Sequence, residues 1–413
     1  MIYNALLFIV SILIYFSFGI KPFLFIVFST ISTYLVGRYV KGRKWLLIIS
    51  ILVNIFILGF FKFFAVYSTS WFVPLGISYY TLQVISYLVD VYKGKYEYEK
   101  NFIYLALFVT YIPHLYIGPI SRYNDVKEEL VRKKSFDWNR VYEGLQRVVW
   151  GLFKKLVIAS RISILINTVT SNEMTGIIIL VCCLLYSIEL YADFSGGIDF
   201  VLGISKILDI KLVENFDSPY LAENMKEFWN RWHISLSSWL KDYVYIPLGG
   251  NRKGKLRQWI NVMLTFLVSG LWHGINYIVW GLMHGILVIF GNKYNTKWKW
   301  VNRVINFVIV SILWIFFIYQ DNITSLTMLT KVFDNFKLPL LSLGLGISDF
   351  VILGISILIL TLYDVNKDKL LDKFKKLRVE FKTVFLCTSI ILVIVFGVYG
   401  IGFNVSDFIY SKF

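Results

Sequence analysis

The segment FWNRWHISLSSWLKDYVYIPLGG (residues 228–250) lies between two strongly hydrophobic stretches of the chain. It contains three tryptophans, two basic residues, an aspartate, three serines and one of the four histidines. On a helix over residues 229–243, spacings of three and four place an aromatic and aliphatic face beside a polar face. The first face holds Trp229, Trp232, Leu236, Trp239 and Tyr243, and the second holds Asn230, His233, Ser237 and Lys241. This pattern predicts a helix that lies at the membrane interface or lines a polar cavity, and by itself it favours a simple interfacial anchor.

The composition of the chain indicates a membrane protein. Of its 413 residues, 57% are hydrophobic and 16% are charged, whereas a soluble domain carries about 25% charged residues. Charge-free runs recur, and about 20 apolar residues are enough to cross a bilayer. Candidate spans cover residues 6–19, 23–36, 45–61, 102–117, 148–169, 176–202, 262–272, 277–290, 304–319, 340–363 and 384–401. We expect an all-α polytopic membrane protein with about 11 spans, forming one domain over residues 1–413.

The strong positive charge is explained by membrane topology. A net charge of +16 would suggest a nucleic-acid partner in a soluble domain. Here the basic residues gather in expected loops, at residues 38–44, 127–140, 252–257 and 367–382. This distribution follows the positive-inside rule and suits contact with lipid headgroups, so we expect no nucleic-acid partner. The three cysteines form no CxxC motif or Cys–His cluster, and we expect no metal site.

A second group of polar residues lies in SGLWHGINYIVWGLMHG (residues 269–285). If this segment is one helix, His284 lies within about 20° of His273 around the axis and roughly 16 Å along it. Asn276 lies near the same stripe. An ionisable residue deep in a membrane usually faces an internal cavity, which makes His273 a functional candidate. A structural histidine bonded to a neighbouring helix is an equally good interpretation of its position.

Several other polar residues favour structural roles. Glu189 and Asp193 share one helix face at a spacing of four, and Asp199 follows them. We expect these acids to pair with basic residues of other helices, and lining a polar funnel is the functional alternative. His114 lies beside a turn rich in Pro and Gly, where we expect a histidine at the lipid interface. The segment VPLGISYYTLQVISYLVDVYKG (residues 73–94) is expected to form a short helix buried in protein.

Five motifs, taken in chain order, resemble those of the membrane-bound O-acyltransferase family. They are VPLGISYYTLQVISYLVDVYKG, IGPISRY, YADFSGGIDF, NFDSPYLAENMKEFWNRWHISLSSWLKDYVYIPLGGNRKG and TFLVSGLWHGINYIVWGLMHG. The resemblance covers residues 73–285 and is closest to the bacterial branch that holds alginate O-acetylases and the D-alanyl transferases of teichoic acid. It implies a ring of tilted membrane helices, with re-entrant or interfacial helices, around a thin central tunnel.

The resemblance also implies which residues form the site. The family's histidine maps onto His273, and its preceding polar partner maps onto His233. His273 would deprotonate the acceptor hydroxyl, a role that suits the ordinary histidine pKa of about 6.5. His233 would orient the acyl donor or polarise its carbonyl. Candidates for lining the substrate tunnel are Asn230, Ser237, Trp272, Asn276, His284 and Asp193, and candidates for contact with an anionic donor or a carrier protein are Arg252, Lys253, Lys255 and Arg257.

The activity implied by the resemblance is transfer of an acyl group, with acetyl favoured, to hydroxyls of an extracytoplasmic polysaccharide. The donor would be acyl-CoA or an acyl-carrier thioester on the cytoplasmic side, and no cofactor would be bound. The protein would be a multi-pass component of the bacterial cytoplasmic membrane, would contact the lipid bilayer, and would work with accessory membrane-anchored transfer proteins.

Two other functions remain open at this point. D-alanyl transfer from a carrier-protein thioester to teichoic acid uses the same mechanism with other substrates. A polysaccharide or lipid transporter is the rival from another class, but it predicts internal repeats, and the sequence shows none. An assembly scaffold would tolerate replacement of His273.

Overall fold

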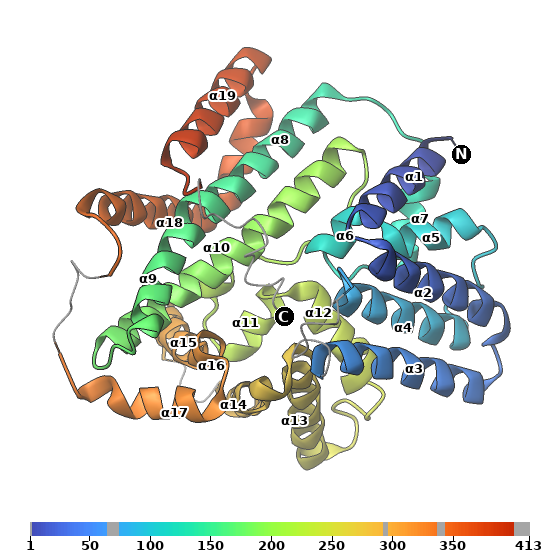
Figure 1. The fold of residues 1–413 in the computed structure, drawn as a ribbon, viewed down its shortest axis with the longest axis horizontal. Helices are drawn as coiled ribbons and strands as arrows, with labels where there is room; N and C mark the ends of the chain where they lie inside the picture. Colours follow the sequence, from blue (N-terminus) through green and yellow to red (C-terminus); the bar gives the residue numbers. More distant parts are fainter. Residues whose placement is uncertain (1, 64–73, 292–295, 337–342, 400–413) are drawn as a thin grey trace. The chain divides into compact units, whose positions relative to one another are not determined.

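All regular secondary structure in the described part of the computed structural model is helical (Figure 1). The structure describes residues 2–63, 74–291, 296–336 and 343–399. The predicted all-α class is therefore confirmed. Contacts divide the chain into two compact units, unit 1 (residues 1–137 and 204–214) and unit 2 (residues 138–203 and 215–413). The expectation of one functional domain over the whole chain stays a prediction.

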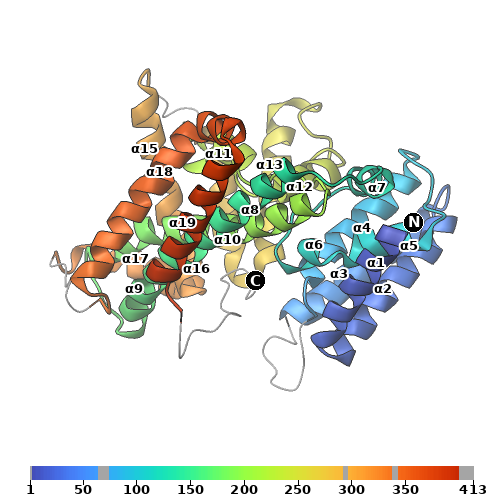
Figure 2. The same cartoon turned by 90° about the horizontal axis from the view of Figure 1, so that it is seen from above.

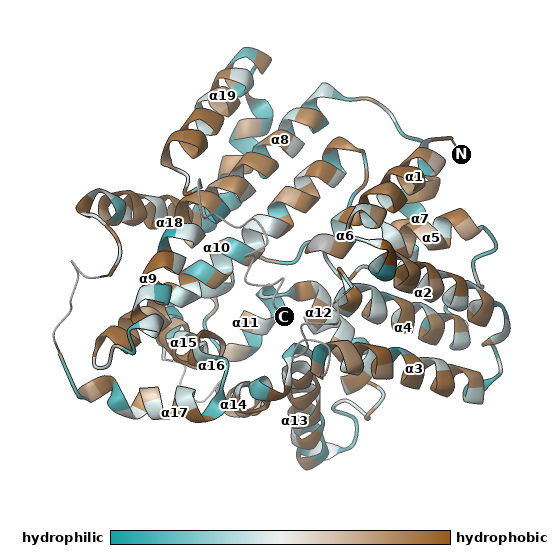
Figure 3. Cartoon of the chain, in the orientation of Figure 1, coloured by the Kyte–Doolittle hydropathy of each residue, from teal (hydrophilic) through white to brown (hydrophobic). Residues whose placement is uncertain are grey.

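Among the described residues, six helical segments are long and apolar enough to cross a membrane (Figure 3). They are Ile20–Tyr39, Lys44–Phe63, Ile178–Ile207, Lys299–Tyr319, Ile347–Lys376 and Val379–Phe396. Shorter apolar helices cover Ile2–Ser17, Phe102–Leu115 and Ile275–Phe290. The chain is thus a multi-pass membrane protein, while the total of about 11 spans and the ring around a tunnel stay predictions. Val73, residues 340–342 and residues 400–401, which belong to predicted segments, lie outside the described residues.

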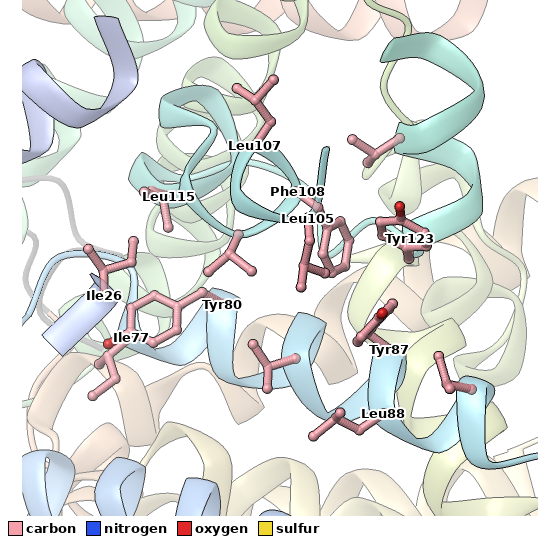
Figure 4. Close-up of a cluster of buried hydrophobic side chains, with 14 of the residues drawn as sticks. Ile26, Ile77, Tyr80, Tyr87, Leu88, Leu105, Leu107, Phe108, Leu115 and Tyr123 are labelled. Carbon is pink, nitrogen blue, oxygen red and sulfur yellow. The ribbon is translucent and has the colours of Figure 1, made fainter. Parts of the chain in front are cut away.

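Unit 1 is built around a helix that is buried on nearly all sides. Its elements are α1 (Ile2–Ser17), α2 (Ile20–Tyr39), α3 (Lys44–Phe63), α4 (Ile77–Tyr92), α5 (Phe102–Thr110), α6 (Ile112–Tyr116) and α7 (Tyr123–Val131). Helix α4 contacts α2, α3, α5, α6 and α7 (Figures 1 and 2), and its residues Tyr80, Tyr87 and Leu88 belong to the core of the unit (Figure 4). It begins after Gly76, whose φ of 73° favours glycine. The expectation of a short helix buried in protein is confirmed for α4.

The span predicted for residues 102–117 is broken, and the histidine within it is buried. Helix α5 ends where Tyr111 adopts an extended conformation, and α6 follows. His114 in α6 is fully buried, so the prediction of a histidine at the lipid interface is wrong. The ring nitrogens of His114 lie 3.1 Å from Ser121 Oγ and 3.4 Å from Gln83 Nε2. These polar partners explain why the histidine can be buried in the unit.

Unit 2 contains the remaining helices. They are α8 (Trp138–Leu152), a π-helical turn (Phe153–Ala159), α9 (Ser160–Ser171), α10 (Ile178–Ile207), whose last residues belong to unit 1, α11 (Met225–Arg231), α12 (Ile234–Leu240), α13 (Gly254–His273), α14 (Ile278–Phe290), α15 (Lys299–Leu313), α16 (Ile315–Tyr319), α17 (Asn322–Thr330), α18 (Ile347–Lys376) and α19 (Val379–Phe396). The apolar stretch of α10 is 72% buried, against 50% or less for the other spans. Helix α10 is therefore the central helix of the unit.

Helices α8 and α10 approach closely because glycines face each other across the contact. A Cβ atom at Gly203 would lie 2.7 Å from the Gly144 carbonyl oxygen, and one at Gly196 would lie 2.8 Å from the Gly151 carbonyl oxygen. Small residues permit this kind of approach between membrane helices.

Two of the three acidic residues that were expected to pair with bases, Asp193 and Asp199, form ion pairs with other segments, whereas the described residues offer no ion pair to Glu189. Asp199 accepts hydrogen bonds from Lys154 Nζ at 2.6 Å and from Arg147 Nε at 2.8 Å. Asp193 pairs with Lys155. Both lysines come from the π-helical turn, whose wider geometry points two consecutive side chains toward α10. The structural interpretation of Asp193 and Asp199 is thus confirmed.

The predicted basic loops at residues 127–140 and 252–257 are helical in part, and the loop at residues 367–382 is helical almost throughout. Residues 367–376 continue α18 beyond a bend at Asn366, and α19 begins at Val379. Only residues 377 and 378 separate the two helices. The prediction of a loop over residues 367–382 is therefore wrong, because charge density alone does not distinguish a solvated helix from a loop.

The substitution Lys154→Met should destabilise the protein by about 3 kcal/mol. It removes the buried ammonium of Lys154 and leaves the half-buried Asp199 carboxylate with one cation instead of two, and breaking such a pair by removing one partner is costly. The measurement is reversible unfolding in mixed micelles. As a control, Lys100→Met removes a cation of an exposed pair and should cost less than about 1 kcal/mol. Equal effects of the two substitutions would contradict the structural role of the α10 ion pairs.

Candidate active site

His233 lies at a break between two short helices. Helix α11 ends at Arg231, Trp232 is extended, and His233 adopts a left-handed conformation with φ 44° and ψ 52° before α12 begins. The predicted continuous helix over residues 229–243 is therefore wrong. A left-handed conformation is uncommon for a residue with a Cβ atom, and such positions gather at functional sites.

The break is stabilised by residues 215–217, which form hydrogen bonds with the backbone groups that the two helix ends leave free. The Asn215 carbonyl oxygen accepts the N–H of Ile234 at 3.0 Å, and Asn215 Oδ1 accepts the N–H of Ser235 at 3.0 Å. The N–H of Asp217 donates to the Arg231 carbonyl oxygen at 3.0 Å. Asn215 thus caps the start of α12 from the segment that precedes α11, and Asp217 caps the end of α11.

The same asparagine fixes the tautomer of His233. Asn215 Oδ1 must be the oxygen of the amide, because it accepts a backbone N–H. His233 Nδ1 lies 3.3 Å from this oxygen and therefore carries the ring hydrogen. Burial lowers the pKa of the His233 imidazole to about 3, so the ring is neutral at neutral pH. Its Nε2 atom then has a lone pair, and His233 can accept a proton or a hydrogen bond at that atom.

His273 is the last residue of α13, and its position depends on the following glycine. Gly274 has φ 145° and ψ 167°, which ends the helix, and a short turn leads into α14. Helices α13 and α14 pack closely at Gly270, where an added Cβ atom would lie 2.5 Å from the Tyr277 carbonyl oxygen. The prediction of one helix through residues 269–285 is wrong, and with it the separation of roughly 16 Å along one axis between the two histidines.

Aromatic rings surround the His273 imidazole. Its centroid lies 4.8 Å from Trp272, 6.1 Å from Tyr277, and 5.4 Å from both Trp280 and Phe317. Each of these contacts is edge-to-face, a favourable geometry for aromatic pairs. The ring is therefore fixed by packing, and its side chain is only 6% exposed.

Trp272 connects the two candidate histidines. Its ring lies 6.1 Å from the His233 ring and 4.8 Å from the His273 ring. These histidines lie 40 positions apart in the sequence, yet both contact the same indole. This shared contact makes His233, Trp272 and His273 the candidate active site.

His284 is placed in the aromatic core behind the site. It is fully buried, and its Nδ1 atom accepts a hydrogen bond from Trp229 Nε1 at 3.3 Å. The Trp280 ring contacts both His284, at 4.7 Å, and His273, at 5.4 Å. His284 is thus positioned to hold Trp229 and Trp280.

The other tunnel candidates occupy varied positions. Asn230 is exposed, and Ser237 donates its hydroxyl hydrogen to the Trp232 carbonyl oxygen at 3.2 Å. Asn276 donates to the Gln320 carbonyl oxygen at 2.8 Å. Asp193 is held by its ion pair with Lys155. Their roles as tunnel residues stay predictions.

The basic candidates lie far from His273 along α13. Arg252 and Lys253 precede the helix, Lys255 and Arg257 lie in its first turn, and all four are exposed. Sixteen residues of α-helix separate Arg257 from His273, which corresponds to about 24 Å. A donor that touches both would need a long flexible arm.

Asn215 is the residue of the candidate site that the sequence patterns missed. It lies within the quoted motif that begins NFDSPY, but helix periodicity carries no information about a hydrogen bond to a segment 18 residues away. Among the described residues, no cluster of three or more His, Cys, Asp or Glu side chains could hold a metal ion. The arrangement itself offers two imidazoles and an oriented lone pair, which are the groups needed for proton transfer during acyl transfer.

Comparison with known proteins identifies the chemistry that such a site performs in relatives. A sequence model of the membrane-bound O-acyltransferase family matches residues 97–330, more than half of the chain. The matched region includes both histidines of the candidate site. The resemblance predicted from the five motifs is confirmed.

Individual relatives divide between two acyl groups. The chain is 35% identical to the probable alginate O-acetylase AlgI of Pseudomonas syringae pv. tomato, over 76% of this chain and 67% of the relative. It is 34% identical to the peptidoglycan O-acetyltransferase of Helicobacter pylori, over 67% of this chain and 62% of the relative. It is 32% identical to the teichoic acid D-alanyltransferase of Bacillus subtilis, over 55% of this chain and 62% of the relative. The chain spans about two thirds of the lengths of these relatives.

Stability should fall as the pH drops below about 6.5, in part because of His233. Its pKa is lowered in the folded protein, so between pH 6.5 and 3 the unfolded chain binds a proton that the folded chain does not. The loss should reach about 2 kcal/mol at pH 5. His233→Asn, which tolerates the left-handed backbone, should give a shallower dependence of the unfolding free energy on pH. Parallel curves for the two proteins would show that His233 is not buried in its neutral form.

Proposed function

Because the chain belongs to the membrane-bound O-acyltransferase family, we propose that it transfers an acyl group to hydroxyls of an extracytoplasmic cell-surface polysaccharide. The donor is acyl-CoA or an acyl-carrier thioester on the cytoplasmic side. The protein acts in the bacterial cytoplasmic membrane, with accessory membrane-anchored transfer proteins that deliver the group to the polymer. The observation that carries the proposal is the contact of His233 and His273 with one indole ring, that of Trp272.

The reaction needs no covalent intermediate on the protein. The oxygen of the acceptor hydroxyl attacks the thioester carbonyl carbon while its proton moves to an imidazole nitrogen. The C–S bond then breaks, and the departing thiolate takes up the proton from the imidazolium. One imidazole can perform both proton transfers, so the cycle ends with the histidine neutral again.

We assign the base role to His273, in line with the family resemblance, and an acceptor role to His233. The N–H group at Nδ1 of His233 is engaged by Asn215, so the ring has no second hydrogen with which to polarise a carbonyl. Through Nε2 it can instead accept a hydrogen bond from the substrate. Asn215 acts as a positioning residue, because it sets both the tautomer of His233 and the break that presents it.

Acetyl is the favoured acyl group. The alginate O-acetylase aligns over 76% of this chain, while the teichoic acid D-alanyltransferase aligns over 55%. The broader match supports an acetyl donor and a polysaccharide acceptor. D-alanyl transfer to teichoic acid is the second candidate, supported by the 32% identity to the Bacillus subtilis relative.

Replacing His273 with alanine should lower the ester content of the cell-surface polymers by about 100-fold or more, because a general base is lost. Mild base releases ester-linked acetate and D-alanine, and quantifying both identifies the acyl group in the same experiment. Membrane abundance must equal that of the wild type. His114→Gln, which changes a buried histidine of unit 1, should leave the esters in place. Unchanged esters in His273→Ala, with a surface phenotype in the deletion strain, would instead favour a transporter or scaffold.

Asn215→Asp should raise the pKa of His233, which is about 3 in the wild type, by about 1–3 units. A carboxylate beside Nδ1 raises the pKa of His233, so the neutral ring is lost at a higher pH. The rate at pH 5, relative to the rate at pH 8, should therefore be lower than in the wild type. Asn261→Asp introduces an acid at another buried asparagine, which bonds to the Gly250 carbonyl oxygen, and should leave this ratio of rates unchanged. If Asn215→Asp lowers the rate equally at all pH values, the protonation state of His233 has no part in the reaction.

A further inference from the structure

A groove of about 210 Å³ runs along the membrane-spanning part of unit 1. Helices α2 and α3 form its two walls, and α4 contributes its floor. The wall residues are Phe25, Phe28, Ser29, Ser32, Thr33 and Val36 on α2, and Leu46, Ile49, Ser50, Val53, Asn54 and Ile57 on α3. In both helices they recur at spacings of three and four, so each helix contributes one continuous face.

Most of the residues that line the groove are apolar, but six are polar, and the buried Ser29 hydroxyl makes no hydrogen bond to any described residue. The hydroxyls of Ser32 and Thr33 both donate to the Ser29 carbonyl oxygen, at 3.1 Å and 2.6 Å. The Ser50 hydroxyl donates to the Leu46 carbonyl oxygen at 2.8 Å. These donors are satisfied within their own helices, as is common for Ser and Thr in membrane helices. Their small size leaves the space that larger side chains would fill.

The length of the groove matches the depth of one lipid leaflet. It extends along α2 from Phe25 to Val36, a distance of about 16 Å at 1.5 Å per residue. This is roughly half of the 30 Å hydrocarbon core of a bilayer. Both α2 and α3 are membrane spans of which less than a third is buried inside the protein. The sides of α2 and α3 that face away from the groove are therefore also exposed to lipid.

Cationic and aromatic side chains gather where the groove meets the end of the two spans. The connection between α2 and α3 places Arg38, Lys41, Arg43 and Lys44 within seven consecutive positions, and residues 36–45 include no acid. All four basic side chains are exposed, as are Tyr39 and Trp45. The Arg43 guanidinium lies 5.6 Å above the centre of the Tyr39 ring. Exposed aromatic residues beside basic ones are typical of the level of lipid headgroups.

We propose that the groove and the α2–α3 connection together bind one anionic phospholipid. One acyl chain lies between α2 and α3 over α4, and the phosphate lies among Arg38, Lys41, Arg43 and Lys44. The cluster of positive charge without acids selects an anionic headgroup, since each basic residue near a membrane surface attracts anionic lipid. A partner helix does not fit, because a helix with its side chains is about 10 Å wide and the groove holds only about 210 Å³.

The test is native mass spectrometry of the purified protein after exchange into detergent with added phosphatidylglycerol or phosphatidylcholine. The wild type should retain one phosphatidylglycerol molecule and little phosphatidylcholine. The double substitution Lys41→Gln/Arg43→Gln should weaken retention roughly 30-fold. Ser32→Phe, which fills the groove but leaves the charges in place, should abolish retention of either lipid.

Two matched controls make the result decisive. Ile31→Phe adds the same ring to an α2 position that is exposed and outside the groove, and Lys373→Gln/Lys375→Gln removes two exposed cations from α18. Both controls should retain phosphatidylglycerol like the wild type. Equal retention of the two lipids by the wild type, or equal retention by Ser32→Phe and Ile31→Phe, would overturn the proposal. Circular dichroism of each variant establishes that the helices are intact.

Discussion

A helix that breaks inside a protein core must find partners for the backbone groups that it leaves free, because a buried N–H or C=O group without a hydrogen bond is costly. In this chain residues 215–217 provide those partners at the break before α12. Because Asn215 uses its carbonyl oxygen for Ile234 and its side chain for Ser235, one residue binds the first two N–H groups of α12. The imidazole of His233 is oriented by the same amide oxygen. Asn215 therefore both binds the free N–H groups of α12 and orients the imidazole of His233.

The surrounding aromatic rings convert this local arrangement into a fixed site. Phe194, which belongs to α10, lies with its ring centroid 4.9 Å from that of His233. The Trp272 ring contacts both histidines. Behind them, Trp280 packs between His273 and His284. Rings packed edge to face leave little rotational freedom, so the two imidazoles keep their positions without a bound ligand. Phe194 belongs to α10, and the ion pairs of Asp193 and Asp199 fix the position of this helix. The ion pairs therefore also fix the position of the ring that packs against His233.

Much of the architecture could be predicted from composition and motifs. Long apolar runs predicted the membrane class, the acids of α10 were expected to pair with bases, and the ordered motifs identified the family and both histidines. The break at His233 could not be predicted, because the hydrophobic spacing of residues 229–243 fits a continuous helix equally well. A left-handed histidine depends on hydrogen bonds from residue 215, and these are invisible to local periodicity. The same limit applies to His114, whose burial depends on Gln83 and Ser121 in other segments.

The short sequence distance between Asn215 and the α11–α12 break has a consequence for biosynthesis. Closing a loop of about 20 residues costs little conformational entropy compared with bringing together distant segments. The first half of the site can therefore form once residue 235 has left the ribosome, before α13 and the later spans have emerged. His273 then joins a framework that already exists. The order of synthesis therefore places His233 before His273, and the second histidine packs against the first half of the site.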